Sequence, residues 1–293
     1  MSELQAANLF SVKGMYFLIT GGIGEMMAHA LDVNGAAKVF ILGRREASLQ
    51  RVAAAAKNGS LIPIVCDVTR KDSLAAAAAT ISSQVPYLNA VIANSGAAGP
   101  MDAYSGNFTG TPSLSDLQKH LWSTTQEDVN ATFGLNIAGS YYTFLAFLPL
   151  LEKGNTHPQS VSAAGYVTSH FITTGSIAGF SRANMIGYPY GASKAALNHL
   201  TKTLATEFAP YGIRANTIVP GFFVSEATEG MTGGAPVEIP GNLPKEVNPS
   251  LRAGNKEDMA GAILYLTSRA GGFTNGSVHL IDGGGLSIRP GTY

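Results

Sequence analysis

Apolar runs of five residues alternate with helix-forming segments through the first third of the chain. The runs have the length of buried parallel strands, and they are Met15–Ile19, Lys38–Leu42, Leu61–Val65 and Asn89–Ala93. The segments between them are rich in alanine and other helix formers, and they are 25–35, 46–56 and 71–81. This alternation predicts an α/β fold with a doubly wound parallel sheet.

The rest of the chain continues the pattern with longer connections. The predicted elements are a loop over 97–124, a helix over 126–151, a strand over 165–173, a helix that carries Tyr190 and ends near 208, a strand over 213–218, a helix over 256–268 and a strand over 277–281. Residues 222–250 hold glycines and prolines with little periodicity, which predicts a substrate lid. Because the chain shows neither a repeat nor a second set of elements, residues 1–293 are interpreted as one Rossmann-type domain of about seven strands with helices on both faces.

One stretch carries side chains suited to proton transfer. Ser176 follows a predicted strand, and Tyr190 and Lys194 lie four residues apart in the next helix, on one face. There the ammonium would favour the tyrosinate and lower the Tyr190 pKa from about 10. Ser176 could hydrogen-bond the substrate oxygen that Tyr190 protonates. The spacing alone is a weak signal, since a helical tyrosine above a lysine is more often packing beside a solvated charge.

Composition narrows the function classes. The formal net charge is +0 and there is no basic run, which argues against nucleic acid or a membrane surface as a partner. The sequence starts without an apolar signal segment, and no apolar run reaches membrane-spanning length, so we predict a cytoplasmic protein. Cys66 is the single cysteine, which excludes an internal disulfide and indicates a small buried apolar residue. The six histidines lack metal-ligand spacing, so no metal site is predicted.

Eight short motifs occur in one order along the chain. They are Thr20-Gly21-Gly22, Asp67-Val68, Asn94-Ser95-Gly96, Asn136, Ser176, Tyr190 with Lys194, Pro220-Gly221 and Asp282-Gly283-Gly284. In this order the sequence resembles the short-chain dehydrogenase/reductase family over nearly its whole length. The amino-acid sequence of segments such as YGASKAAL resembles that of fungal members which act on small intermediates of secondary-metabolite biosynthesis.

The resemblance implies a four-residue catalytic site. Tyr190 would be the general acid or base for the carbonyl or alcohol oxygen, and Lys194 would lower its pKa and bind the nicotinamide ribose. Ser176 would orient the substrate oxygen, and Asn136 would hold a water that relays protons to Lys194. Taken singly, Asn136 could be a helix-interior amide and Ser176 a hydroxyl in a turn.

The resemblance also implies a dinucleotide site along the carboxyl ends of the strands. Its predicted contacts are Gly21, Gly22, Ile23, Gly24, Arg44, Asp67, Val68, Asn94, Gly96, Tyr190, Lys194, Pro220 and Gly221. Arg44 follows the second strand, where an acidic residue would accept from the ribose of NAD and an arginine pairs with a 2′-phosphate. NADP is therefore the predicted cofactor, unless Arg44 is only an exposed arginine at a helix start.

The phosphate-binding turn departs from the family pattern. The pattern T-G-x-x-x-G-x-G needs three more residues than the chain has between Thr20 and Gly24. Those residues let backbone N–H groups approach the pyrophosphate at a helix N-terminus, and Glu25 adds a negative charge there. Either the helix unwinds to rebuild a turn that binds NADP, or cofactor binding is lost, or residues are missing from the sequence at an exon boundary.

Three functions follow from these alternatives. The first is an NADP-dependent oxidoreductase that reduces a ketone or oxidises a secondary alcohol. The second is a cofactor-independent isomerase, cyclase or lyase in which Tyr190 and Lys194 enolise a carbonyl compound. The third is a non-catalytic binding protein on the same fold.

Two further expectations concern the partners of the chain. An apolar or aromatic small-molecule substrate is suggested, against ordinary lid packing, by Phe222, Phe223, Val224, Met231, Met101 and Tyr104. The resemblance implies a homodimer or homotetramer that pairs helices 126–151 and 187–208. Their apolar residues are equally compatible with packing on the sheet.

Overall fold

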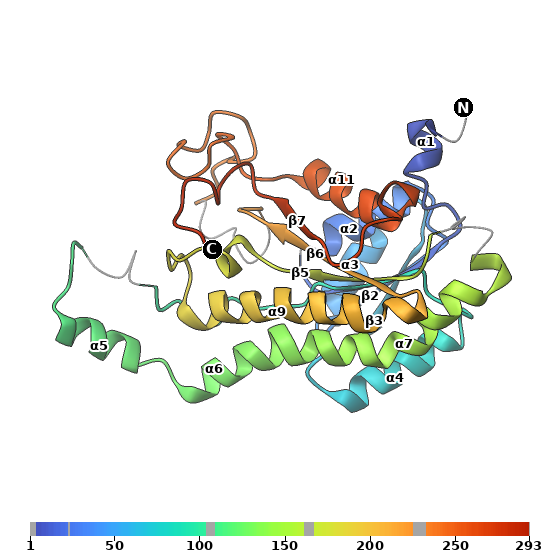
Figure 1. The fold of residues 1–293 in the computed structure, drawn as a ribbon, viewed down its shortest axis with the longest axis horizontal. Helices are drawn as coiled ribbons and strands as arrows, with labels where there is room; N and C mark the ends of the chain where they lie inside the picture. The colour runs from blue at the N-terminus through green and yellow to red at the C-terminus, as the bar shows by residue number, and fades with distance from the viewer. Residues whose placement is uncertain (1–3, 23, 104–108, 161–166, 225–232, 293) are drawn as a thin grey trace.

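A twisted parallel sheet forms the centre of the computed structural model, which describes residues 4–22, 24–103, 109–160, 167–224 and 233–292 (Figure 1). It has seven strands in the order β3-β2-β1-β4-β5-β6-β7, and every neighbouring pair is parallel. The strands are β1 (Tyr16–Thr20), β2 (Lys38–Gly43), β3 (Leu61–Val65), β4 (Ala90–Ala93), β5 (His170–Thr174), β6 (Arg214–Pro220) and β7 (Val278–Ile281). The predicted α/β fold is confirmed, and the strand order reverses beside β1 as in dinucleotide-binding folds.

Helices cover both faces of this sheet (Figure 1). The helices are α1 (Ala6–Leu9), α2 (Gly24–Val33), α3 (Glu46–Ala54), α4 (Lys71–Ser82), α5 (Leu114–Trp122), α6 (Gln126–Phe133), α7 (Ser140–Thr156), α9 (Tyr188–Glu207) and α11 (Lys256–Thr267). Shorter turns are η3 (Ile177–Gly179), η4 (Ala209–Tyr211) and η5 (Arg269–Gly271), and η2 (Gly134–Gly139) is a π-helical segment. Helices α2, α3 and α11 share one face, and α4, α7 and α9 share the other.

Two apolar cores fill the space between the helices and the sheet. One joins β1 side chains such as Phe17 to α2 and α11, and the other joins Leu18 and Phe171 to α4 and α7. Neighbouring residues of β1 therefore enter opposite cores, as the two-residue period of a strand requires. These strands are apolar throughout because both of their faces are buried.

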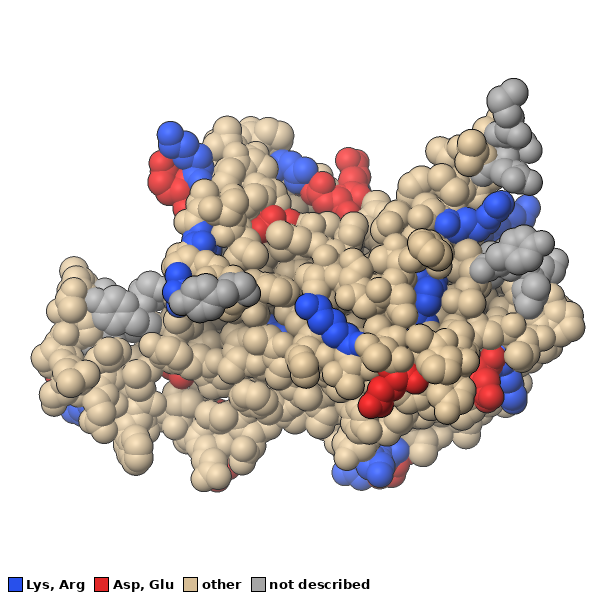
Figure 2. Space-filling model, viewed as in Figure 1, with Lys and Arg blue, Asp and Glu red and all other residues tan. Residues whose placement is uncertain are grey.

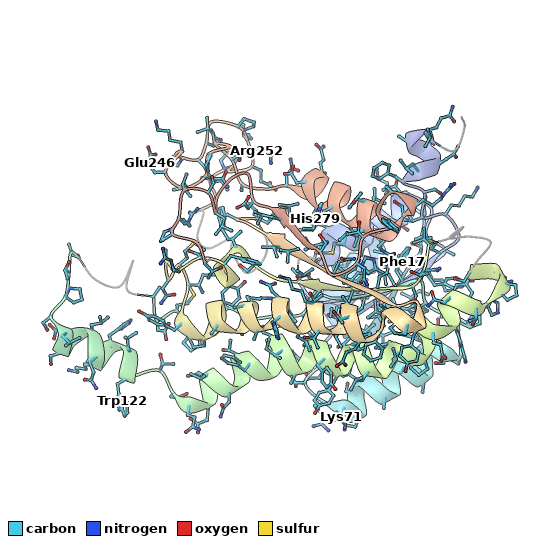
Figure 3. All side chains as sticks on the ribbon, in the orientation of Figure 1. Phe17, Lys71, Trp122, Glu246, Arg252 and His279 are labelled. Carbon is cyan, nitrogen blue, oxygen red and sulfur yellow. The ribbon has the colours of Figure 1, made fainter. Side chains whose placement is uncertain are left out.

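The region predicted as a loop over 97–124 contains a helix, so that prediction was wrong. The Ser113 side chain accepts from the Asp116 N–H at 3.1 Å and caps α5. No residue of α5 is buried, and Trp122, labelled in Figure 3, is 82% exposed and points away from the body of the molecule. The cap was readable in the sequence, but α5 lacks the buried face that makes a helix stand out from its periodicity.

The predicted helix over 126–151 is longer and less regular than expected. It runs from Gln126 to Thr156 and passes through the π-helical segment η2 at its centre. By length and composition it could cross a membrane, contrary to the sequence-based expectation, yet 44% of its most apolar window is buried inside the fold. It packs against α4, α9 and β4, which is the position of a core helix.

Smaller boundary differences complete the comparison. Strand β5 begins at His170, later than the predicted start at 165, and residues 165 and 166 lie outside the described residues. Strand β6 extends to Pro220, two residues further than predicted. The division of the chain into a single domain stays a prediction.

Candidate active site

Strand β5 brings Ser176 to the carboxyl edge of the sheet. The strand ends at Thr174, and Gly175 leads into Ser176, whose backbone is extended and whose side chain is buried. The Ser176 Oγ accepts from the Ala178 N–H at 3.2 Å and caps the short turn η3. The hydroxyl hydrogen is left to donate to another oxygen.

A contact from the loop after β4 fixes the start of α9. The Tyr188 N–H donates to the Oδ1 of Asp102 at 2.9 Å, and the Thr124 hydroxyl donates to Oδ2 at 3.3 Å. Asp102 is buried, and its carboxylate lies at the positive end of the α9 dipole. A side chain at Gly187 would strike the Pro100 carbonyl, so this loop lies directly against the helix start.

Helix α9 holds Tyr190 and Lys194 together. The Lys194 Nζ lies 5.8 Å from the centre of the Tyr190 ring and donates to the Thr174 carbonyl at 2.7 Å. Lys194 is 4% exposed, so its stem crosses from α9 to the end of β5 through the interior. Ser176 lies close enough to the Tyr190 hydroxyl to favour its ionised form, as one smaller contribution to the Tyr190 pKa.

Burial dominates the ionisation of both helix residues. Desolvation raises the pKa of Tyr190 above its ordinary value, and the hydrogen bond from Ser176 opposes this shift. Desolvation lowers the pKa of Lys194 to about 8. The net direction for Tyr190 is opposite to the lowering expected from Lys194, because removing a phenolate from water outweighs its other interactions here.

Asn136 lies in the π-helical segment between α6 and α7, with its side chain buried. Its Oδ1 accepts from the Ala97 N–H at 2.9 Å, and its Nδ2 donates to the Ala97 carbonyl at 3.0 Å and the Ser193 Oγ at 2.9 Å. The amide thus ties the loop after β4 to α9, beside Lys194. Because the side chain is occupied, the predicted water would be held by the Asn136 backbone carbonyl. This carbonyl accepts from the Ser140 hydroxyl at 3.1 Å and has a second lone pair. Single π turns of this kind are frequent at functional sites.

The loop after β4 packs closely against Asn136 and Lys194. At Gly96 a Cβ would lie 3.1 Å from the Asn136 Oδ1 and 3.3 Å from the Lys194 Nζ, so glycine allows the backbone of this loop to approach both side chains. The Asn94 Nδ2 donates to the Gly21 carbonyl at 2.8 Å. The Asn94 Oδ1 is buried without a hydrogen-bond partner among the described residues. An unpaired buried acceptor at this position fits a ligand that donates from a hydroxyl.

The turn between β1 and α2 is short. Gly21 takes a left-handed backbone (φ 70°), and α2 begins at Gly24 without unwinding, as the Gly24 N–H donates to the Gly21 carbonyl at 3.1 Å. A side chain at Gly24 would lie 2.7 Å from Ile19, which explains the glycine. The Glu25 N–H donates to the Gly22 carbonyl at 3.1 Å, and Ile23 lies outside the described residues. Of the alternatives left open by the sequence, the one in which this helix unwinds is not the arrangement seen here.

Glu25 in the first turn of α2 is neutralised by a neighbouring helix. Arg51 of α3 donates to both carboxylate oxygens, at 3.0 and 3.1 Å. His29 lies 3.8 Å from the same carboxylate. The repulsion that Glu25 would exert on a phosphate is reduced by this bidentate pairing.

Arg44 and Asp67 lie just after the carboxyl ends of β2 and β3. Arg44 is exposed, and its charge helps to lower the Asp67 pKa, although hydrogen bonds from Thr69 contribute most. The Asp67 Oδ1 accepts from the Thr69 hydroxyl at 2.7 Å and its N–H at 3.0 Å. Val68 is buried against Gly139.

The segment after β6 only partly matches the predicted lid. Gly221 packs on Asp282 at the end of β7 and follows Pro220. Phe223 is 5% exposed and belongs to the apolar core, so the suggestion that it contacts substrate is wrong. Met101 is exposed, and Tyr104 and Met231 lie outside the described residues.

Among the described residues, no cluster of three or more acidic, histidine or cysteine side chains could hold a metal. His170 is buried, and desolvation holds its pKa well below the ordinary value, which keeps it neutral. Cys66 is buried, and desolvation raises its pKa, so its thiol stays protonated.

The comparisons with known proteins agree on one family. The model of a family described as enoyl-(acyl carrier protein) reductase matches residues 19–285. A protein named short-chain dehydrogenase/reductase PhomF from Diaporthe leptostromiformis is 41% identical over 99% of this chain and 98% of its own. The chain belongs to the short-chain dehydrogenase/reductase family.

Further relatives and a solved structure support this membership. Short-chain dehydrogenase/reductase VdtF from Byssochlamys spectabilis is 36% identical over 99% of this chain and 98% of its own. A Pseudomonas aeruginosa RhlG/NADP active-site complex superposes with a TM-score of 0.74, at 28% identity, over 95% of this chain and 98% of that one. The family resemblance seen in the sequence is confirmed, and the protein is an enzyme of this family.

The structure also shows contacts that sequence reasoning missed. Asp102 at the start of α9 and Ser193 beside Asn136 both hold catalytic candidates in place. Ser193 could have been noticed from its position between Tyr190 and Lys194, but its partner Asn136 lies in a helix far away in the sequence. Asp102 occurs in a predicted loop with no pattern of its own, so no local signal could have identified it.

Proposed function

We propose that this protein is an NADP-dependent oxidoreductase that reduces a ketone, or oxidises a secondary alcohol, of a small apolar or aromatic biosynthetic intermediate. The observation that carries the proposal is the convergence of Ser176, Tyr190 and Lys194 at the carboxyl end of β5. The backbone at Gly96 lies close beside Lys194. Family membership supplies the reaction class, and its relatives are named dehydrogenases and reductases.

The residues present fit a dinucleotide better at its nicotinamide end than at its pyrophosphate. Lys194, Asn94 and Gly96 would contact the riboses, with Pro220 and Gly221 beside the nicotinamide. The turn from Gly21 to Gly24 offers fewer backbone N–H groups than the family pattern. Helix α2 still presents its positive end to this site.

The cofactor would supply or accept the hydride, and this chain's residues would manage the oxygen and its proton. Tyr190 would donate its phenolic proton to the carbonyl oxygen as the alcohol forms. Ser176 would donate a hydrogen bond to the same oxygen and hold it opposite Tyr190. Lys194, charged below a pH of about 8, would stabilise the tyrosinate that remains.

The cofactor-independent alternative rests on one specific observation, the short turn after β1. In that reading Tyr190 would remove or return a proton beside a carbonyl, with no hydride transferred. A protein that binds neither NADPH nor NADH would favour it.

Arg44 would choose between the two cofactors. We expect NADPH to raise the unfolding temperature more than NADH at equal concentration, because the ligand that binds more tightly stabilises the folded state more. Arg44→Ala should weaken NADPH by about tenfold, or about 1.4 kcal/mol, and leave NADH unchanged. The neighbouring Arg45→Ala is the matched control. Equal losses for both cofactors, or a larger effect at Arg45, would refute the role of Arg44.

The protein would act as a homo-oligomer. Tyr141 and Leu145 are exposed on α7. Figure 2 shows one face of the molecule, on which charged side chains are few. By contrast Phe144 and Phe147 are buried in the core, Leu197 is 1% exposed, and none of the three is available to a second copy. Sedimentation of the wild type and a Tyr141→Glu/Leu145→Glu variant would test this, with a monomer expected for the variant.

A further inference from the structure

Asn198 occupies an unusual position on α9. It lies one helical turn beyond Lys194 and is 4% exposed. Both its Oδ1 and its Nδ2 are buried without a hydrogen-bond partner among the described residues. By contrast, Thr201 on the same helix exchanges a hydrogen bond with Thr173 at 2.8 Å and donates to the Leu197 carbonyl at 2.9 Å.

The Asn198 amide lies against both ends of the turn that carries Ser176. A Cβ added at Gly175 would lie 2.7 Å from the Asn198 Oδ1, and one added at Gly179 would lie 3.0 Å from its Nδ2. Ser176 is between these two glycines. The absence of side chains at both glycines therefore lets the amide lie close to this turn.

An amide in this position has a cost. Each buried polar group without a partner costs about 1–3 kcal/mol, whereas a leucine of similar shape would carry no such cost. Buried groups of this kind are commonly satisfied by an ordered water with two to four polar partners. Since the Asn198 Oδ1 lies near Gly175 and its Nδ2 near Gly179, a water bound to this amide would find its second partner in the backbone on either side of Ser176.

We propose that Asn198 is a positioning residue for the reaction, which through one buried water holds the Gly175–Gly179 turn and so sets the Ser176 hydroxyl opposite Tyr190. The proposal rests on the proposed role of Tyr190 as acid or base. It needs neither cofactor nor substrate to be tested, because the influence of Ser176 on the Tyr190 pKa belongs to the protein alone.

The test follows the ionisation of Tyr190 by NMR in protein labelled with ¹³C at the tyrosine Cζ, with the Tyr190 signal assigned from Tyr190→Phe. Ser176→Ala should move the titration midpoint upward, because its hydrogen bond favours the charged form. Asn198→Leu should move it in the same direction. The double variant should show no more than the Ser176→Ala shift, since both changes act through one hydrogen bond.

Asn216→Leu is the matched control. The Asn216 amide is bonded to His170 at 2.6 Å, to the Thr274 carbonyl at 2.8 Å and to the Ser277 N–H at 2.7 Å. Losing these bonds should lower the unfolding temperature without moving the Tyr190 midpoint. Asn198→Leu should do the reverse and leave the unfolding temperature nearly unchanged.

Two results would overturn the proposal. An unchanged Tyr190 midpoint in a folded Asn198→Leu protein would mean that the amide does not act on Ser176. A loss of stability as large as that of Asn216→Leu, or failure to fold, would mean that Asn198 is a structural residue. Because the readout is the ionisation of Tyr190 alone, failure to bind NADPH would leave this test intact.

Discussion

The two ends of the candidate dinucleotide site are built very differently. At the nicotinamide end, side chains from β5, α9 and the π-helical segment are fixed by buried hydrogen bonds such as Lys194 to Thr174 and Asn136 to Ala97. At the phosphate end, the turn from Gly21 to Gly24 is three residues short of the family pattern, and the nearby Glu25 is held by Arg51. The side chains proposed for proton transfer are therefore fixed by more buried hydrogen bonds than the turn proposed for phosphate binding.

The two ends also differ in what a mutation should change. Changes at the nicotinamide end should alter turnover and the ionisation of Tyr190. Changes at the phosphate end should alter cofactor affinity and leave the chemistry intact. Each prediction below acts on one end alone, or on neither.

The largest effect is expected from Tyr190→Phe. It removes the acid–base hydroxyl, so turnover of a ketone that the wild type reduces should fall by about 10²–10⁴-fold. NADPH affinity should stay within about threefold, or about 0.7 kcal/mol, of the wild-type value. Tyr188→Phe, at an exposed position two residues away, is the control. Turnover within tenfold of wild type in Tyr190→Phe would exclude it as the acid.

Lys194→Met should separate activity from stability. The folded-state pKa of about 8 lies below the ordinary 10.5, so the unfolded chain binds more protons between these values. The contribution of Lys194 to stability is therefore fully present above pH 10.5 and is lost as the pH falls through 8. At pH 7 the free energy of unfolding of Lys194→Met should be about 1–3 kcal/mol higher than that of the wild type. This figure allows for the lost hydrogen bond to the Thr174 carbonyl. The same variant should have no turnover.

Urea unfolding at pH 7 and pH 10.5 would check this prediction. The stability advantage of the methionine variant should shrink between pH 8 and pH 10.5, because the wild-type protein then no longer has to keep Lys194 neutral against a proton that the unfolded chain would bind. A methionine variant less stable than the wild type at pH 7 would show that the buried ammonium is net stabilising.

A longer turn at the phosphate end should sharpen the comparison. Inserting Ala-Ser-Ser between Gly21 and Gly22 restores the family spacing and adds backbone N–H donors for the pyrophosphate. NADPH affinity should rise by about tenfold, or about 1.4 kcal/mol. The Tyr190 titration midpoint of the cofactor-free protein should not move. An insertion that leaves affinity unchanged would mean that the short turn already makes the full set of phosphate contacts.

Protonation of His170, which lies outside both ends of the candidate site, should change stability without changing turnover or cofactor affinity. His170 is buried between the Leu266 carbonyl and Asn216, and burial lowers its pKa well below 6.5. Its contribution to stability is present above pH 6.5 and should be lost at up to about 1.4 kcal/mol per pH unit as the pH falls below that value. Urea unfolding of His170→Asn should show a flatter acid limb. A parallel acid limb would assign the loss to other groups.

The fold was predictable from the sequence because its central strands are apolar on both faces. Runs such as Met15–Ile19 and Lys38–Leu42 can only be buried, and the helices between them fix the parallel order. Helix α5 was missed because it buries nothing. The interruption of the long helix by η2 was missed because π turns carry no composition signal of their own.

The sequence predicted which residues belong to the candidate site, but not their surroundings. Ser176, Tyr190, Lys194 and Asn136 were identified from their motifs, and the fold brings them to one edge of the sheet. The direction of the Tyr190 pKa was wrong, because burial depends on neighbours that a linear motif does not show. Phe223 was assigned to the substrate region, but its ring packs on Gly254 in the core.

Calorimetric titration of the purified protein with NADPH tests the central claim most directly. The account predicts a single site with micromolar affinity, about −8 kcal/mol, and weaker binding of NADH. This result would show that the short turn still holds a dinucleotide beside Tyr190. A well-folded protein that binds neither NADPH nor NADH would contradict the oxidoreductase assignment and favour proton-transfer chemistry without hydride.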